Sequence, residues 1–226
     1  MPEASDIVVR DLRPADEAAA VRIFADAFDG FPVLQVMTGS GDGGRERLER
    51  LFAMEFESDS KLSAVVAELD GAVSGAFTYA DSPDCSATST TRTVRFLRIA
   101  GTRVFRTMRM FSRIDRVHPK SRHRHLPTIG VDPVLQGRGI GQRLMQEFHR
   151  RCDEDGIAGY LETIRWADPA RPSLEDFYAG LGHEIADVLP MSDDWAVVTM
   201  LRPPTPPTPP TPRPLRPTGA DAARGV

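Results

Sequence analysis

Hydrophobic positions recur along the chain with two periods, which predicts that strands and helices are mixed within one domain. Alternating or continuous runs of β-type side chains predict strands at residues 7–12, 62–68, 72–79, 126–131, 159–164 and 195–201. Apolar residues spaced by three or four predict helices at residues 14–28, 48–56, 92–116, 141–156 and 174–181. The order of these elements includes hairpins and does not strictly alternate strand with helix. The pattern therefore predicts a mixed α/β fold.

Turn and cap residues mark several boundaries between these elements. Asp70-Gly71 lies between two strand patterns and is a strong hairpin signal. Pro14 is expected at the first position of a helix, where its missing N–H costs nothing. Gly156 is expected to end a helix in the left-handed conformation. Gly101 is expected to break the long helix over 92–116.

Length and composition exclude several classes of protein. The chain has 226 residues, of which 41% are hydrophobic and 27% charged, the usual mix of a globular protein. It contains no apolar run of about 18 residues, and its first residues do not form a secretory signal. Two cysteines are too few for a disulfide framework or a zinc ribbon, and Cys152 falls on the inward stripe of a predicted helix. We therefore expect a cytoplasmic protein without a membrane partner and without a metal site.

Proline is concentrated at the C-terminal end of the chain. Of the 19 prolines, nine lie between Pro203 and Pro217 in PPT repeats. Such a segment cannot form helix or sheet hydrogen bonds and has little apolar surface to bury. We therefore expect one globular domain over 1–202 and a disordered tail over 203–226. The tail has PxxP spacing, so binding to a partner with an aromatic groove remains an open alternative.

The formal net charge of −4 conceals an uneven distribution of charge. Residues 92–124 carry 11 basic side chains and one acidic one, whereas residues 1–91 carry 7 basic and 17 acidic. A basic helix of this kind can neutralise nucleic-acid phosphates. However, arginines on the outer face of an amphipathic helix are usually only solvated, and the rest of the chain is acidic. Nucleic-acid binding through the arginine stripe of 92–124 is therefore a second hypothesis.

The glycine-rich turn QGRGIG over 136–141 is the segment that most clearly carries chemistry. It lies between a predicted strand and a predicted helix. Glycines let backbone N–H groups converge on an anion, and the start of the helix adds free N–H groups and the positive end of its dipole. The turn is not a P-loop, because no Gly-Lys-Ser/Thr follows, and it is not the G-x-G-x-x-G dinucleotide fingerprint. The spacing present is Gln-x-x-Gly-x-Gly.

This spacing resembles the acyl-CoA loop of the GCN5-related N-acetyltransferase (GNAT) family, and more closely that of its puromycin N-acetyltransferase branch. The resemblance rests on three motifs in order, HRHLPTIGVDPVLQGRGIG, GYLETI and FYAGLGHE, and covers roughly residues 6–202. It implies the GNAT fold, a mixed and mostly antiparallel central sheet flanked by helices. That sheet is splayed between the cofactor strand at about 125–131 and the next strand at about 159–164.

The resemblance implies acetyl-CoA as co-substrate and assigns most of the site. The strand before the loop offers backbone groups to the pantetheine arm, with the N–H of Val131 as donor to the thioester oxygen. Tyr178 is implied as the general acid for the departing thiolate. The implied cofactor-binding residues are Ile129, Gly130, Val131, Gln136, Gly137, Arg138, Gly139, Ile140, Gly141 and Gln142.

Amine attack on a thioester also requires a group that accepts the amine proton, because an amine with a pKa near 10 is mostly protonated at neutral pH. Three candidates lie near the expected end of the cofactor: Glu162, His123 and His125. Glu162 is a lone acid in an otherwise apolar strand, and the histidines precede the cofactor strand. No Cys or Ser is placed as a nucleophile, so we expect direct transfer of the acetyl group.

Departures from the family pattern leave the acceptor open. Leu174 occupies the position where the family commonly has a cofactor-contacting Asn, and His183 replaces the aromatic residue of Leu-Gly-Phe. The connection before Tyr178 is also longer than usual. We expect an N-acetyltransferase for a primary amine of a small molecule, such as an aminonucleoside or antibiotic-like amine. A protein acceptor, a non-catalytic role on this scaffold, and the choice between monomer and homodimer remain open alternatives.

Overall fold

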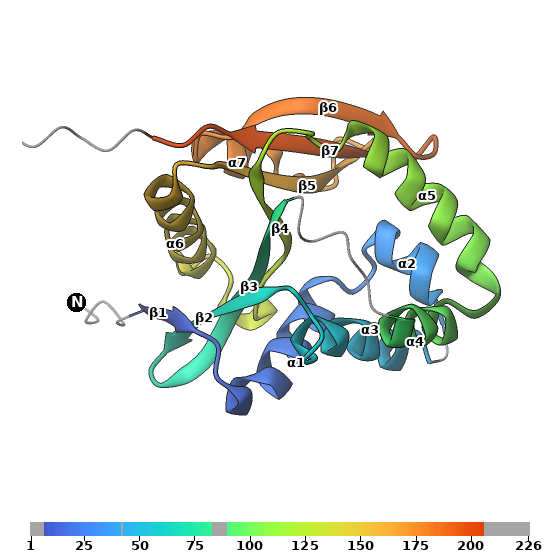
Figure 1. Ribbon diagram of the computed structural model, residues 1–226, viewed down its shortest axis with the longest axis horizontal. Helices are drawn as coiled ribbons and strands as arrows, with labels where there is room; N and C mark the ends of the chain where they lie inside the picture. The colour runs from blue at the N-terminus through green and yellow to red at the C-terminus, as the bar shows by residue number, and fades with distance from the viewer. Residues whose placement is uncertain (1–6, 42, 83–89, 206–226) are drawn as a thin grey trace, which may run out of the picture.

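A single twisted sheet of seven strands organises the molecule (Figure 1). The computed structural model describes residues 7–41, 43–82 and 90–205. The strands lie in the order β1-β2-β3-β4-β5-β7-β6. Their bounds are β1 Ile7–Asp11, β2 Ser63–Leu69, β3 Ala72–Ser82, β4 His123–Val131, β5 Ala158–Trp166, β6 Glu184–Pro190 and β7 Trp195–Arg202. Every neighbouring pair is antiparallel except β4–β5, which is parallel. The predicted mixed α/β fold is confirmed.

Helices cover both faces of this sheet. Their bounds are α1 Glu17–Ala27, α2 Pro32–Thr38, α3 Gly44–Ala53, α4 Thr90–Ala100, α5 Val104–Val117, α6 Ile140–Asp155 and α7 Glu175–Gly180. Helix α6 lies on one side of the sheet, whereas α1 to α5 lie on the other (Figure 1). The two faces have separate apolar clusters, one built around Phe148 of α6 and the other around Phe24 of α1. The fold is thus a three-layer arrangement of helix, sheet and helix.

Helix α6 packs closely on β3 because β3 has a glycine at the contact. A Cβ built on Gly75 would lie 2.9 Å from Cγ2 of Ile140 and 3.0 Å from Cδ1 of Leu144, closer than a real side chain tolerates. Ile140 and Leu144 are both fully buried. The close approach fixes the first turn of α6 relative to the sheet, which matters because the glycine-rich turn leads into that turn.

Most predicted elements are present with boundaries shifted by a few residues. The Asp70-Gly71 hairpin, the helix stop at Gly156 and the break at Gly101 occur as predicted. Strand β4 is longer than predicted, because it begins at His123 and not at Leu126. Cys152 is fully buried in the core, and burial raises the pKa of its thiol to about 12.

Two elements were not predicted from the sequence. Helix α2 has Pro32 at its first position, a start signal that could have identified it. Strand β6 lies at the edge of the sheet and is largely exposed, with acidic residues where a buried strand would have apolar ones. Edge strands commonly carry such charges, since charges discourage pairing with another chain. The alternating pattern is therefore weak in β6.

The expected proline-rich tail falls outside the described residues from residue 206 onward.

Among the residues described, no helix combines the length and the apolar character needed to cross a membrane.

Two buried histidines join α6 to the segment after α7. Nε2 of His149 lies 2.9 Å from Nε2 of His183, so one ring donates a hydrogen bond to the other. Burial lowers the pKa of His149 to about 4 and that of His183 to about 3, with the charge of Arg202 acting in the same direction. Both rings are therefore neutral in the folded protein at neutral pH.

This pair predicts a loss of stability in mild acid. An unfolded histidine has a pKa near 6.5, so between about pH 6.5 and pH 4 the unfolded chain binds protons that the folded chain does not. The free energy of unfolding should then fall as pH falls, by up to about 1.4 kcal/mol per pH unit for each histidine. Replacing both residues, His149→Leu with His183→Phe, should flatten this dependence in urea unfolding measured from pH 7 to pH 4.5.

The matched control is Glu184→Gln, a change at the exposed neighbouring position. The control should keep the pH dependence of the unaltered protein. A double variant that loses stability toward acid as steeply as the unaltered protein would contradict the assignment.

Candidate active site

The parallel strands β4 and β5 pair over only the first part of their length. The register joins residues 123–126 of β4 to residues 158–161 of β5 and ends at the pair Leu126–Leu161. Both strands continue, β4 to Val131 and β5 to Trp166. The second halves of the two strands therefore diverge, as the resemblance implied for this pair of strands.

Pro127 lies at the point of divergence and provides a local reason for it. A proline has no N–H to donate to a strand ladder. The register between β3 and β4 also shifts here, because Thr78 pairs with Thr128 whereas Ala80 pairs with His125. A β-bulge of this kind bends and twists the strand that carries the extra residue. Pro127 belongs to the motif HRHLPTIGVDPVLQGRGIG, but the motif alone does not show that strand pairing ends at this residue.

The glycine-rich turn leads from β4 to the start of α6. Its residues Gln136, Gly137, Arg138 and Gly139 are exposed, whereas Ile140 is buried and anchors the helix. Gly139 precedes the helix with φ +82°, a left-handed conformation that favours glycine, and space around its Cα is open. The first N–H groups of α6 have no partner within the helix.

This geometry fits the anionic part of a CoA molecule. The first amides of α6 belong to Ile140, Gly141 and Gln142, which follow directly on the exposed turn. Free amides and the positive end of the helix dipole favour a phosphate group at such a position. Arg138 adds a cation on the same exposed turn. At the end of β4, Gly130 and Val131 remain paired with Ala76 and Gly75 of β3. The chain therefore reaches the glycine-rich turn directly from a paired strand.

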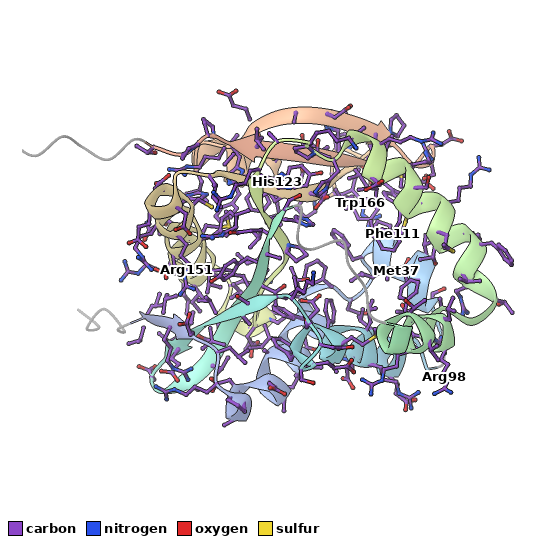
Figure 2. All side chains as sticks on the ribbon, viewed as in Figure 1. Met37, Arg98, Phe111, His123, Arg151 and Trp166 are labelled. Atoms are coloured by element: carbon purple, nitrogen blue, oxygen red, sulfur yellow. The ribbon has the colours of Figure 1, made fainter. Side chains whose placement is uncertain are left out.

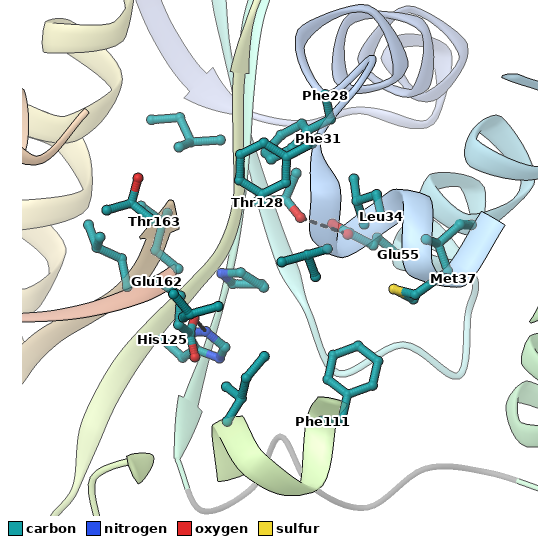
Figure 3. Close-up of a pocket in the computed structure, with 18 of the residues that line it drawn as sticks. Phe28, Phe31, Leu34, Met37, Glu55, Phe111, His125, Thr128, Glu162 and Thr163 are labelled. Atoms are coloured by element: carbon teal, nitrogen blue, oxygen red, sulfur yellow. Dashed lines mark hydrogen bonds and ion pairs between the residues drawn. The ribbon is translucent and has the colours of Figure 1, made fainter. Parts of the chain in front are cut away.

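A pocket of about 710 Å³ lies where β4 and β5 diverge. The strand side of its wall includes Pro127, Thr128 and Ile129 of β4 and Glu162, Thr163 and Ile164 of β5. The other side is formed by residues of α2 to α5 and of the segments beside them, among them Phe31, Met37, Phe96 and Phe111. Figure 3 shows Glu162 and His125 together on one side of the pocket, opposite the side chains of Phe28, Phe31, Leu34 and Met37.

Glu162 is held by histidines at the strand side of the pocket. Its Oε2 lies 2.7 Å from Nε2 of His125, a hydrogen-bond distance, and its Oε1 lies 3.8 Å from Nδ1 of His118. The Glu162 side chain keeps 21% of its surface exposed. Burial alone would raise its pKa, but the charge of His125 and the hydrogen bonds from the neighbouring histidines hold that pKa well below its usual range. Glu162 is therefore a carboxylate at neutral pH.

His123 lies behind this pair and does not line the pocket. It is fully buried, with Nδ1 2.8 Å from the carbonyl oxygen of Ser121 and Nε2 3.0 Å from Nε2 of His118. Burial lowers its pKa. Figure 2 shows His123 inside the molecule beside β4. The sequence candidates thus differ in position: Glu162 and His125 reach the pocket, whereas His123 contacts it only through His118.

Tyr178 lies on α7 and lines the same pocket. Its side chain belongs to the core cluster and only 4% of the residue is exposed. Burial raises the pKa of the Tyr178 hydroxyl, so this group keeps its proton at neutral pH. Leu174, which stands where the family commonly has Asn, also lines the pocket.

Two further polar residues of the pocket were not identified from the sequence. His118 follows α5, and its ring packs on the rings of His123, His125 and Tyr160. Glu55 accepts hydrogen bonds from Thr78 at 2.7 Å and from Thr128 at 2.8 Å. The three histidines of 118–125 are close in sequence, which is a usable signal for His118. Nothing local distinguishes Glu55, because its threonine partners come from β3 and β4.

The described arginines of α4 and α5 do not line the pocket. Arg98 projects away from α4 (Figure 2), Arg95 forms an ion pair with Glu57, and Arg113 donates to the carbonyl oxygen of Pro190. Of the described residues that line the pocket, none is Lys or Arg.

Within the described ranges, no group of three or more His, Cys, Asp or Glu side chains is arranged to hold a metal ion.

The sequence matches the model of the acetyltransferase (GNAT) family over residues 34–182. Several solved structures have the same fold. One is described as histone acetyltransferase HPA2 and related acetyltransferase from Corynebacterium glutamicum, with 21% identity and a TM-score of 0.64, covering 89% of this chain and 98% of that chain. A second is the ribosomal-protein-S18-alanine N-acetyltransferase from Escherichia coli, with 17% identity and a TM-score of 0.52, covering 88% and 94%.

A third is an aminoglycoside 6′-N-acetyltransferase in complex with coenzyme A, with 14% identity and a TM-score of 0.51, covering 89% of this chain and 99% of that chain. At these identities the likeness shows the fold, and the family match extends over more than half of the chain. The chain therefore belongs to the GNAT family and is an N-acetyltransferase that uses acetyl-CoA.

Proposed function

We propose that this enzyme acetylates a primary amine of a small molecule bound in the pocket between β4, β5 and the helical side. The observation that carries the proposal is that Glu162, His125 and Tyr178 line one pocket at the divergence of β4 and β5. These groups supply a carboxylate, an imidazole and a protonated phenol, which are the types of group that acyl transfer from a thioester to an amine requires. Acetyl-CoA supplies the acetyl thioester.

The pair Glu162–His125 handles the amine proton. A free amine of pKa about 10 arrives mostly as an ammonium ion, which the Glu162 carboxylate attracts. Glu162 is itself a weak base, because its pKa is held low. Neutral His125 donates a hydrogen bond from Nε2 to Glu162 and accepts the amine proton at its other ring nitrogen, and Glu162 then stabilises the imidazolium that forms. Of the sequence candidates, Glu162 then acts mainly through His125, and His123 only supports His118.

Tyr178 donates the proton that the departing thiolate needs. Its raised pKa keeps the hydroxyl protonated over the range in which amines react. The glycine-rich turn holds the pyrophosphate through residues 136–142, and Ile129 to Val131 hold the pantetheine arm. This allocation follows the family resemblance, and of these residues Ile129 and Tyr178 line the pocket.

A small molecule fits this pocket better than a protein acceptor does. Residues of α2 to α5 and of the segments beside them line the side opposite the strands, so Glu162 faces a pocket with two walls whose volume of about 710 Å³ suits a small molecule. The described arginines of α4 and α5 do not line the pocket and have no part in this chemistry. The puromycin branch rests on the sequence motifs alone, and puromycin is therefore included among the acceptors tested.

The test is release of free CoA from acetyl-CoA in the presence of a panel of amines that includes puromycin, an aminoglycoside and a lysine peptide. We expect amine-dependent thiol release and an acetylated amine by mass spectrometry. In the variant Gly139→Glu, both acetyl-CoA binding and thiol release should be lost, because a carboxylate at the turn crowds and repels the pyrophosphate. The matched control is Gly71→Glu.

Gly71 also has a positive φ with open space around it, but it lies in the β2–β3 hairpin. The control therefore has the same added charge and similar backbone strain, and it should bind acetyl-CoA normally when folded, as judged by thermal melting. Normal cofactor binding by Gly139→Glu would exclude the turn as the pyrophosphate site.

Replacing Tyr178 by Phe should lower kcat while leaving acetyl-CoA affinity nearly unchanged. The ring still fills its place in the core, and only the hydroxyl that protonates the thiolate is lost. General acid catalysis typically contributes 10²–10⁴-fold, so a fall in kcat of about 100-fold or more is expected. Steady-state kinetics and calorimetric titration with CoA measure the two quantities. Unchanged kcat would rule out Tyr178 as the acid.

Replacing Glu162 by Gln should move the acid limb of the pH profile of kcat/KM to lower pH. A neighbouring carboxylate favours the protonated form of the group that accepts the amine proton, and the amide lacks this charge. A residue with only a structural role would lower the rate without moving the limb. His125→Ala should remove the limb. An unshifted limb in Glu162→Gln would contradict the proposed pairing.

A further inference from the structure

The helical side of the pocket is rich in aromatic side chains. Phe28 and Phe31 meet edge to face with ring centroids 5.1 Å apart, and Phe96 and Phe111 lie 6.5 Å apart. The first pair comes from the α1–α2 segment and the second from α4 and α5, and all four residues line the pocket. Figure 3 shows Phe111 approaching the pocket from α5 and Phe31 from the other side. This part of the pocket is suited to an apolar body, especially an aromatic ring.

The permanent charges of the described lining favour a cation. Its acidic residues are Glu55, Asp115 and Glu162, and its titratable bases are His118 and His125, with no Lys or Arg among the lining residues described. A carboxylate on the acceptor would have to compete with Glu162 for the two histidines, which already interact with its oxygens. Burying an unpaired charge is costly. The pocket thus admits an ammonium group and opposes an anionic one.

The polar groups of the pocket are placed so that they can bind the amine end of the acceptor. Glu162 and His125 lie on the strand side, where the amine must meet the acetyl group. Glu55 is bound by Thr78 and Thr128, so its two oxygens already accept hydrogen bonds within the protein. An acceptor with many hydroxyl and amino groups would find few partners among the phenylalanines, and its desolvated polar groups would cost affinity.

From these observations we infer that the acceptor is a lipophilic monoamine, with one primary amine, an aromatic or otherwise apolar body and no carboxylate. This inference rests on the proposed function and assigns its substrate class. The amine lies at Glu162 and His125, and the body lies against the phenylalanine pairs. A pocket of about 710 Å³ is within the range of small-molecule sites and also holds the acetyl end of the donor.

The test compares acceptors that differ in one group. 2-Phenylethylamine presents the amine and ring, L-phenylalanine adds a carboxylate, and L-phenylalaninol adds a neutral group at the same carbon. We expect kcat/KM for phenylethylamine to exceed that for phenylalanine by about 100-fold or more, since a buried unpaired charge costs several kcal/mol and 1.4 kcal/mol is tenfold. Phenylalaninol should recover most of the difference. An aminoglycoside and a lysine peptide should be poor acceptors.

Two variants on one helix test the aromatic wall. Phe111 lines the pocket with 41% of its surface exposed, whereas Phe105, also on α5, is 82% exposed and does not line it. Phe111→Ala should raise KM for phenylethylamine by about tenfold, the value of burying part of a ring, and should leave kcat/KM for ethylamine unchanged. Phe105→Ala should change neither. Thermal melting confirms that both variants fold.

The outcomes separate the two proposals. If no amine in the panel is acetylated, the proposed function itself fails. If amines are acetylated but phenylalanine, the aminoglycoside or the peptide equals or exceeds phenylethylamine, the function stands and the inferred substrate class is overturned. Equal effects of Phe111→Ala and Phe105→Ala would also overturn it, because such a result would show that the wall at Phe111 does not contribute to acceptor binding.

Discussion

The early end of the pairing between β4 and β5 is the constraint on which the site depends. The two strands are held together up to Leu126 and Leu161, and the bulge at Pro127 directs the rest of β4 away from β5. Backbone groups that would otherwise bond across the sheet are thereby available to a bound molecule. Glu162 is the first residue of β5 beyond the last pair, so its carboxylate lies at the start of the pocket. In a fully paired sheet the backbone beyond this position would be hydrogen-bonded to β4.

The parts that bind and the parts that react are placed by the same sheet. Helix α6 is fixed against β3 through Gly75, and its exposed first turn receives the glycine-rich loop from the end of β4. The helices of the opposite face enclose the acceptor side with phenylalanines. One strand, β4, therefore connects the glycine-rich turn to the histidines beside Glu162, and this continuity sets the distance between the turn and the pocket.

The charge at the centre of the site is stabilised by neighbouring polar groups and not by solvent alone. Glu162 remains ionised although it is partly buried, because His125 and His118 interact with its two oxygens. His123 is itself hydrogen-bonded to His118 and to the backbone. A carboxylate in this setting is well suited to hold an imidazole and a substrate cation and poorly suited to take a proton itself. The proposed division of roles between Glu162 and His125 rests on this difference.

The sequence by itself determined the fold class, most elements and the glycine-rich turn before α6, because local periodicity, caps and glycine spacing specify these directly. It also placed Tyr178, Glu162 and His125 among the candidates, through motifs whose order is fixed along the chain. Only the tertiary structure decided which histidine reaches the pocket, and it added His118, Glu55 and the phenylalanine walls. Those features arise where β3, β4, β5, α2 and α5 meet. Contacts between distant segments leave no periodic signal in any one of them, so the acceptor pocket could not be read from the chain alone.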